Sequence, residues 1–254
     1  MIEDTFVELP LVTRAANPHL RTMNLPKTLA LAKRELNLLY TRPPEARNGG
    51  WDEGWFGREH AYHTYFLLRL LGEGVAIEIG HFAVCASGAS IASYGGDITH
   101  TWCATRDIAP IDLSMDFRYR LTAPQLGGPI VGCAGQNGEY TIHYCKDAAS
   151  FEAWLDAPLT GPSIGFLKTD APVPEFTTLL DHPETFFLPG SEEEWLRLYG
   201  PEIFCRITMH VYKVVQGHVP PLAGKLDSRS AFQYIRSNYQ SSRLKIHRML
   251  AAAN

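Results

Sequence analysis

The chain has few cysteines and no long hydrophobic run. Its five cysteines among 254 residues stand at positions 85, 103, 133, 145 and 205. An odd number at scattered spacings is typical neither of a disulfide framework nor of a zinc site. We therefore expect reduced thiols, which indicates an intracellular, cytoplasmic protein. No apolar run reaches the ~18 residues that a membrane-spanning helix needs, so no membrane span is predicted.

The chain also lacks a strong excess of either charge. A net charge of −4 gives no reason to expect that the whole chain binds a polyanion such as nucleic acid. Residues 1–4 are acidic and precede no apolar segment, so we expect no signal peptide. Hydrophobic residues make up 45% and charged residues 20%, which is ordinary for a folded protein. A chain of this length can bury a core without disulfides or metals.

Helical and strand patterns are mixed along the chain. Apolar residues at helical spacing predict a helix from Pro26 to Tyr40, capped by Asn24. Further helices are predicted over 59–71, around 151–154, and from near 191, 201 and 228. Strands are predicted over 75–85, 98–104, 108–113 and 139–145. The Ser- and Gly-rich segment 86–97 and the Pro-rich segment 158–174 are predicted to be loops or linkers. This order predicts an α+β fold.

Chemistry-bearing residues gather around position 100. His100 and Trp102 alternate on one face of a predicted strand, and Asp112 lies in the next strand pattern. An aspartate that orients a histidine is the arrangement that makes the histidine a general base. The alternative is a half-buried histidine without a chemical role.

These motifs resemble a known family when they are taken in order. Leu-Leu-Arg-Leu-Leu-Gly at 67–72 leads into a strand at 75–80, and His100-x-Trp102 and Asp112-Leu113-Ser114 follow. The stretch 51–117 resembles the core of transglutaminase-like proteins, which share the papain-like fold. Arg-Asn-Gly-Gly-Trp-Asp at 47–52 is similar to the Arg-Gly-Gly-Trp-Cys motif of arylamine N-acetyltransferases, which belong to the same superfamily. The resemblance implies a papain-like core with an antiparallel sheet and a mainly helical C-terminal region.

The chain departs from this family at the nucleophile. The family places a cysteine at the beginning of the helix, and counting back from Gly72 leads to Gly57 and Arg58. The second motif places Asp52 at the cysteine position. The resemblance therefore implies a site without its usual thiol, and we expect none of the five cysteines to be a nucleophile.

The resemblance also implies roles for several side chains. His100 is the expected base and Asp112 the residue that orients it. The start of the helix 59–71 is expected to line the same cleft, which makes His60 a third catalytic candidate. The candidate substrate-binding residues are Trp102, Arg58, Asp52 and His81.

Three functions stay open at this point. The leading one is acyl transfer, or hydrolysis of an amide, ester or thioester, by the histidine–aspartate pair without a cofactor. The second is a catalytically inactive relative that binds a peptide or a partner protein. The third is a metal-dependent enzyme that uses His60, His63 and His100. The expected substrate is a small acyl compound or an acylated peptide.

Two regions are predicted. Residues 1–157 form the transglutaminase-like core with an N-terminal helical arm, and 175–254 form a helical region packed on it or appended to it. Residues 225–254 carry six positive side chains and one negative side chain. This basic segment is either a solvated helix face or a docking face for a phosphate-bearing carrier.

Overall fold

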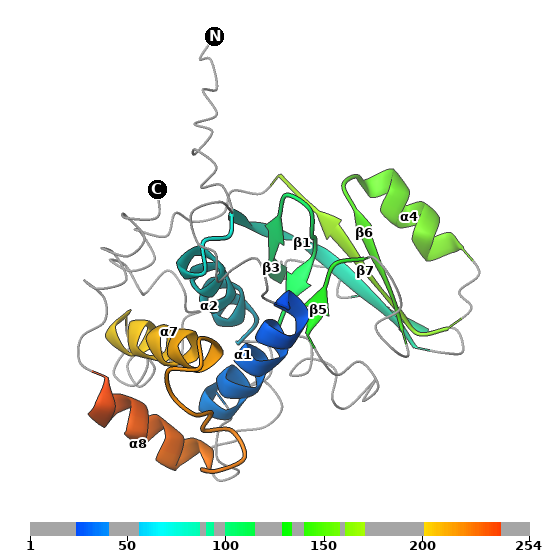
Figure 1. Ribbon diagram of the computed structural model, residues 1–254. Helices are drawn as coiled ribbons and strands as arrows, with labels where there is room; N and C mark the ends of the chain where they lie inside the picture. Colours follow the sequence, from blue (N-terminus) through cyan, green and yellow to red (C-terminus); the bar gives the residue numbers. More distant parts are fainter. Residues whose placement is uncertain are drawn as a thin grey trace.

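The fold combines helices with one sheet, which confirms the α+β class. The computed structural model describes residues 24–40, 56–86, 90–93, 100–114, 129–133, 140–157, 161–170 and 201–239. The helices in these ranges are α1 (Leu25–Tyr40), α2 (Phe56–Leu70), α4 (Ala148–Asp156), α7 (Pro201–Val215) and α8 (Ser228–Asn238). The strands are β1 (Val75–Ala86), β2 (Ser90–Ser93), β3 (His100–Thr105), β4 (Ile111–Asp112), β5 (Ile130–Val131), β6 (Thr141–Cys145) and β7 (Ser163–Lys168) (Figure 1).

The strands form a seven-stranded sheet in the order β5-β4-β3-β1-β7-β6, and β2 pairs with β1. Every pair is antiparallel except β6 and β7, which are parallel. The prediction of an antiparallel sheet was therefore wrong at this edge. A parallel pair needs a crossover connection, and α4 lies between β6 and β7 in the chain.

Two strands occupy segments that were predicted to be loops. β7 falls within 158–174 and lies between β1 and β6, with Ser163–Phe166 buried. β2 falls within 86–97 and continues the antiparallel pairing of β1. Both predictions were wrong because they gave more weight to the Gly, Ser and Pro residues of these segments than to their short apolar runs. Hydrogen bonding to β1 makes both segments strands despite that composition.

The register divides the side chains of the sheet between two faces. The helix-covered face includes Cys103, whose Sγ donates to the Ala61 carbonyl of α2 at 3.1 Å. It also includes Gly165, where an added Cβ would lie 2.2 Å from Trp154 of α4. Because side chains alternate along a strand, the opposite face carries Trp102 and its neighbours on β1 and β7. We call it the aromatic face, and its core is Phe82, Trp102, Ile130, Tyr140, Ile142, Ile164 and Phe166.

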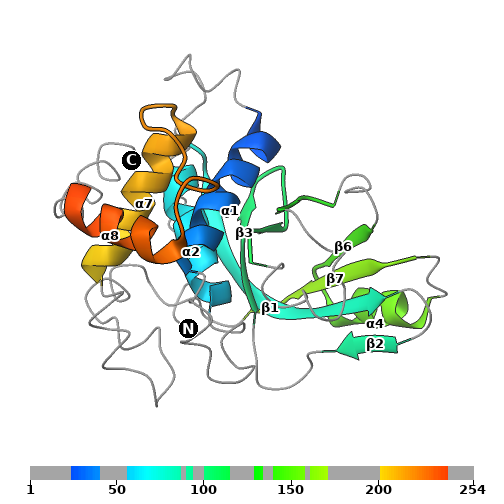
Figure 2. The same ribbon diagram turned by 90° about the horizontal axis from the view of Figure 1, so that it is seen from below.

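The helices α1, α2, α7 and α8 gather on one side of the molecule, away from α4 (Figure 2). They share one apolar core, to which Leu29, Phe66, Ile207 and Ile235 contribute from the four helices. The predicted cap of α1 is confirmed, because the Lys27 amide donates to Asn24 Oδ1 at 3.1 Å. The helix predicted near 191 and the part of the last helix beyond 239 lie outside the described residues. None of the described helices is long and apolar enough to cross a membrane.

Candidate active site

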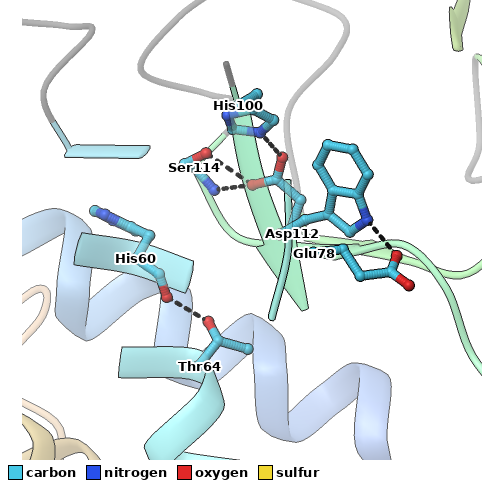
Figure 3. A network of polar contacts seen from close by, with 7 residues as sticks. His60, Thr64, Glu78, His100, Asp112 and Ser114 are labelled. Atoms are coloured by element: carbon cyan, nitrogen blue, oxygen red, sulfur yellow. Dashed lines mark hydrogen bonds and ion pairs between the residues drawn. The ribbon is translucent and has the colours of Figure 1, made fainter. Parts of the chain in front are cut away.

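His100 and Asp112 meet at the edge of two neighbouring strands. His100 is the first residue of β3 and Asp112 the last of β4, and these strands are antiparallel. His100 Nε2 lies 2.5 Å from Asp112 Oδ2 (Figure 3). Since an ionised carboxylate can only accept, Nε2 carries the proton of this bond. The predicted placement on antiparallel strands within hydrogen-bond reach is confirmed.

Asp112 is held by a second residue on its other oxygen. Oδ1 accepts from both the backbone amide and the hydroxyl of Ser114, each at 2.7 Å. Burial raises the pKa of the Asp112 carboxyl, but the charge of His100 and the hydrogen bonds from His100 and Ser114 outweigh it and lower the pKa to about 2. Asp112 is therefore an oriented anion at neutral pH.

The surroundings of His100 are aromatic and buried. Its ring centroid lies 4.9 Å from that of Phe82, 6.0 Å from that of Trp102 and 6.3 Å from that of Phe166. The His100 side chain is 0% exposed and that of Asp112 is 2% exposed. In so buried a site, the attraction between an imidazolium and a carboxylate is much stronger than at the surface.

A buried carboxylate, that of Glu78, lies beside Trp102 on the aromatic face. Its Oε2 accepts from Trp102 Nε1 at 2.9 Å and from the Tyr144 hydroxyl at 2.7 Å. Its Oε1 lies 3.0 Å from Lys168 Nζ. Sequence reasoning missed Glu78, although a glutamate inside the apolar strand Val-Ala-Ile-Glu-Ile is a signal that buried partners exist.

His60 lies on the helix side of β3. It is buried in α2, and its carbonyl accepts from Thr64 Oγ1 at 2.6 Å. Helix α2 meets β3 through Ala61 and Cys103, and Cys103 points to the opposite face of β3 from His100. In Figure 3, His60 and Thr64 lie to one side of β3 and Glu78 to the other. The contacts thus unite His100 with Asp112 and do not place His60 on the aromatic face.

Of the four predicted substrate-binding residues, the structure describes the side chains of Trp102 and His81, which point to opposite faces of the sheet. Trp102 is 0% exposed and its polar atom is used by Glu78, so it serves as a wall beside His100. His81 follows Gly80, the cross-strand partner of His100, and therefore points to the helix-covered face. Arg58 belongs to the first turn of α2, with a side chain outside the described part, and Asp52 also lies outside it.

The cysteines described are free thiols. Burial raises the pKa of Cys103 well above its ordinary value, that of Cys133 to about 11 and that of Cys205 to about 12. A thiol with so high a pKa is a poor nucleophile at neutral pH. Cys103 also points away from His100 and donates to Ala61. These observations support the prediction that none of them is catalytic.

The proposed histidine metal site is not formed. Across the described ranges, no three His, Cys, Asp or Glu side chains could hold a metal ion together. His63 faces α7 instead, where its Nδ1 lies 2.8 Å from Thr208 Oγ1 and its ring stacks on Phe204 at 3.9 Å. Burial, with a contribution from His60, lowers the pKa of His63 well below its ordinary value. The metal hypothesis for His60, His63 and His100 was wrong because His100 lies on the opposite face of β3 from α2, which carries the other two histidines.

Comparisons with protein-family models, with curated proteins and with solved structures found no match. The likeness to transglutaminase-like proteins therefore depends on the motifs of residues 51–117 alone. The geometry that bears on function is the His100–Asp112 pair, its Ser114 support and its aromatic enclosure.

Proposed function

We propose that this protein is an enzyme with a papain-like core that transfers or hydrolyses an acyl group. His100 acts as general base, and Asp112 orients it. The observation that carries the proposal is the buried hydrogen bond of 2.5 Å between His100 Nε2 and Asp112 Oδ2. The order of α2, β1, β3 and β4 along the chain agrees with the family resemblance, which gives the proposal its reaction class.

The bond to Asp112 decides which nitrogen of His100 reacts. Nε2 keeps its proton toward Asp112, so proton exchange with a substrate goes through Nδ1. Nδ1 takes the proton of a water or of an amine or hydroxyl substrate as its oxygen or nitrogen attacks the acyl carbon. The imidazolium formed is stabilised by the Asp112 carboxylate. It returns the proton to the leaving amine, alcohol or thiol when the tetrahedral intermediate collapses.

The attacking group comes from water or a second substrate in this proposal. The described thiols have raised pKa values. Ser114 Oγ already donates to Asp112. Because none of the thiols in the described part of the chain suits this role and Ser114 is engaged, the proposed base acts directly on the incoming group. Because His100 is 0% exposed, the proposal also requires its aromatic neighbours to part when substrate binds.

The same burial favours a second candidate function. A papain-like binding module would keep His100 and Asp112 as a structural pair and bind a peptide or a partner protein elsewhere. The apolar packing of His100 against Phe82 and Phe166 favours this candidate. It predicts that substitution of His100 changes stability and leaves no acyl-transfer activity to be lost.

A substrate survey with matched variants separates the two. The wild-type protein is incubated with short- and long-chain thioesters, aryl esters and aryl amides, with water or an arylamine as acceptor. The same panel is applied to His100→Gln and to His143→Gln, a control on β6 whose ring packs on Trp154. We expect turnover that His100→Gln loses and His143→Gln keeps. Wild-type rates equal to those of His100→Gln on every compound would overturn the proposal.

Two further expectations belong to this proposal. A phosphate-bearing acyl carrier is the partner proposed for the basic segment, in which Lys225, Arg229 and Arg236 are exposed. Arg243, Lys245 and Arg248 of that segment lie outside the described residues. Reduced thiols make the cytoplasm the proposed location.

A further inference from the structure

We propose that Glu78 is a positioning residue that fixes the orientation of His100 through the indole of Trp102. The inference rests on the proposed function of His100 and assigns a role to a carboxylate outside the histidine–aspartate pair. It follows from how the indole is held at both ends and from what the indole touches.

One end of the Trp102 indole is held by Glu78. The two residues are direct cross-strand partners on β3 and β1, and Nε1 donates to Glu78 Oε2 at 2.9 Å. This is a charge-assisted hydrogen bond in a buried place, which is stronger than a neutral one. The bond fixes the rotation of the ring as well as its position.

The other end of the indole lies over Gly80. A Cβ added to Gly80 would lie 2.6 Å from Trp102 Cη2, so only glycine allows the ring this close to β1. Gly80 is the cross-strand partner of His100. The indole therefore reaches from the register position of Glu78 to that of His100. Phe166 packs against it edge-on at 5.1 Å, which leaves the ring little freedom to turn.

Glu78 is itself held by groups from two other strands. The Tyr144 hydroxyl of β6 donates to the same Oε2 at 2.7 Å, and Lys168 Nζ of β7 lies 3.0 Å from Oε1. Lys168 is 42% exposed, while Glu78 is 10% exposed, so the carboxylate is anchored at the edge of the buried region. Burial and the bond to Glu78 raise the pKa of Tyr144, which keeps it a donor. Glu78 is thus fixed by β6 and β7, and its hydrogen bond in turn fixes the indole of Trp102 beside His100.

The position of the Trp102 indole affects the orientation of the His100 imidazole. Asp112 fixes Nε2 of His100, and rings that pack on the imidazole limit its rocking about this hydrogen bond. The Phe82 and Trp102 rings, whose centroids lie 4.9 and 6.0 Å from that of His100, limit that motion. Loss of the Glu78 anchor is expected to loosen the Trp102 wall and so to broaden the range of His100 orientations.

The test reads His100 directly, by NMR of protein labelled with ¹⁵N-histidine. The His100 ring signals are assigned from their absence in His100→Gln. In Glu78→Leu, the tautomer signature or the titration of these signals is expected to change, and kcat to fall about tenfold with KM within about twofold. Glu78→Gln keeps an acceptor for the indole, so its His100 signals and its kcat are expected to lie close to those of the wild type. Glu202→Leu, which removes a carboxylate of α7 that pairs with Arg206, is the matched control and leaves His100 unchanged.

Trp102→Phe tests the same link from its other end and decides the question if Glu78→Leu does not fold. Unchanged His100 signals in a folded Glu78→Leu or Trp102→Phe protein would overturn the inference. Its failure is distinct from failure of the proposed function. Changed signals in a protein that turns over no acyl substrate leave Glu78 as a positioning residue and refute catalysis. Normal turnover with unchanged signals supports the proposed function and refutes the positioning role of Glu78.

Discussion

Two buried histidine–carboxylate pairs lie in different layers of this molecule. His100 and Asp112 join β3 to β4, whereas His210 of α7 and Glu35 of α1 lie 2.8 Å apart between Nε2 and Oε2 in the helical layer. The side chains of both pairs are 0–2% exposed. Burial and distance alone therefore do not distinguish a catalytic pair from a structural one.

The two pairs differ in the partners around them. Glu35 also accepts from the backbone amides of Leu222 and Ala223 at 3.0 and 2.9 Å, and His210 Nδ1 lies 3.0 Å from the Tyr239 hydroxyl. This network joins α1, α7, the segment before α8 and Tyr239, the residue that follows α8. The further partner of Asp112 is Ser114, only two residues away.

The comparison indicates different roles for the two histidine–carboxylate hydrogen bonds. The Glu35 network fastens segments that no β-ladder connects, so its hydrogen bonds stabilise the fold. β3 and β4 are already paired through their backbones, so the bond between His100 and Asp112 adds mainly the orientation of an imidazole. This difference supports the assignment of acid–base chemistry to His100 and of a structural role to His210.

The largest effect is expected from Asp112→Asn on activity. The asparagine oxygen can still accept from Ser114, while its amide donates to His100 Nε2 and reverses the tautomer, so that Nδ1 carries the proton and cannot act as base. By analogy with triad enzymes, kcat/KM for the substrate found in the survey should fall about 10³- to 10⁴-fold. Steady-state kinetics measure this. A loss of less than tenfold would show that Asp112 does not set the tautomer of a catalytic histidine.

A large effect on stability is expected from Glu35→Gln. Three N–H groups converge on the Glu35 carboxylate, but glutamine offers one acceptor oxygen and turns an NH₂ toward a donor. The free energy of unfolding should fall by about 3–5 kcal/mol, as when one partner of a buried pair is removed. Asp112→Asn is the matched variant and should cost about 2 kcal/mol, the stabilisation to which the lowered pKa of about 2 corresponds. Urea unfolding of both proteins checks the order, and a larger loss in Asp112→Asn would reverse the comparison.

The acid stability of the wild type and of Asp112→Asn tests whether Asp112 is held as an anion in the folded protein. Its pKa is about 2 in the folded chain against 3.8 for the free group. The folded-state pKa is the lower one, so the stabilisation of about 2 kcal/mol is fully present above pH 4 and is lost as the pH falls through 2. Unfolding free energies measured between pH 5 and 2.5 should therefore fall less steeply in Asp112→Asn than in the wild type. Equal slopes would show that the carboxyl is not held as an anion.

The sequence predicted the local part of this site and missed the long-range part. Strand alternation and the short separation of His100 from Asp112 were enough to predict their hydrogen bond. The first turns of α2 were expected beside His100, but α2 meets β3 through Cys103, on the opposite face. Helix packing of this kind depends on which strand face is covered, and the pattern of one strand does not contain that information.

Contacts between distant positions were the other omission. Glu35 and His210 are 175 residues apart, and Glu78 and Tyr144 are 66 apart. A single sequence shows each as an isolated polar residue in an apolar pattern. What it does show is that Glu35 and Glu78 interrupt buried stretches, which implies partners without naming them. β7 was missed for a related reason, since its place between β1 and β6 outweighs the Gly and Pro in and around it.

The smallest effect is expected from Tyr239→Phe, which tests the outer member of the helical network. This change deletes only the hydroxyl beside His210 Nδ1 and keeps the ring, over which Lys213 Nζ lies at 5.1 Å. Nε2 of His210 faces Glu35, and the Tyr239 hydroxyl lies 3.0 Å from Nδ1 on the other side of the ring. Tyr239 is buried, so Nδ1 would lose this hydrogen-bond partner at a cost of about 1 kcal/mol in the free energy of unfolding. Urea unfolding measures the loss, and His100-dependent turnover should not change. A loss of more than about 3 kcal/mol would mean that Tyr239 supports the network as strongly as Glu35 does, and a change in turnover would mean that the two pairs are coupled.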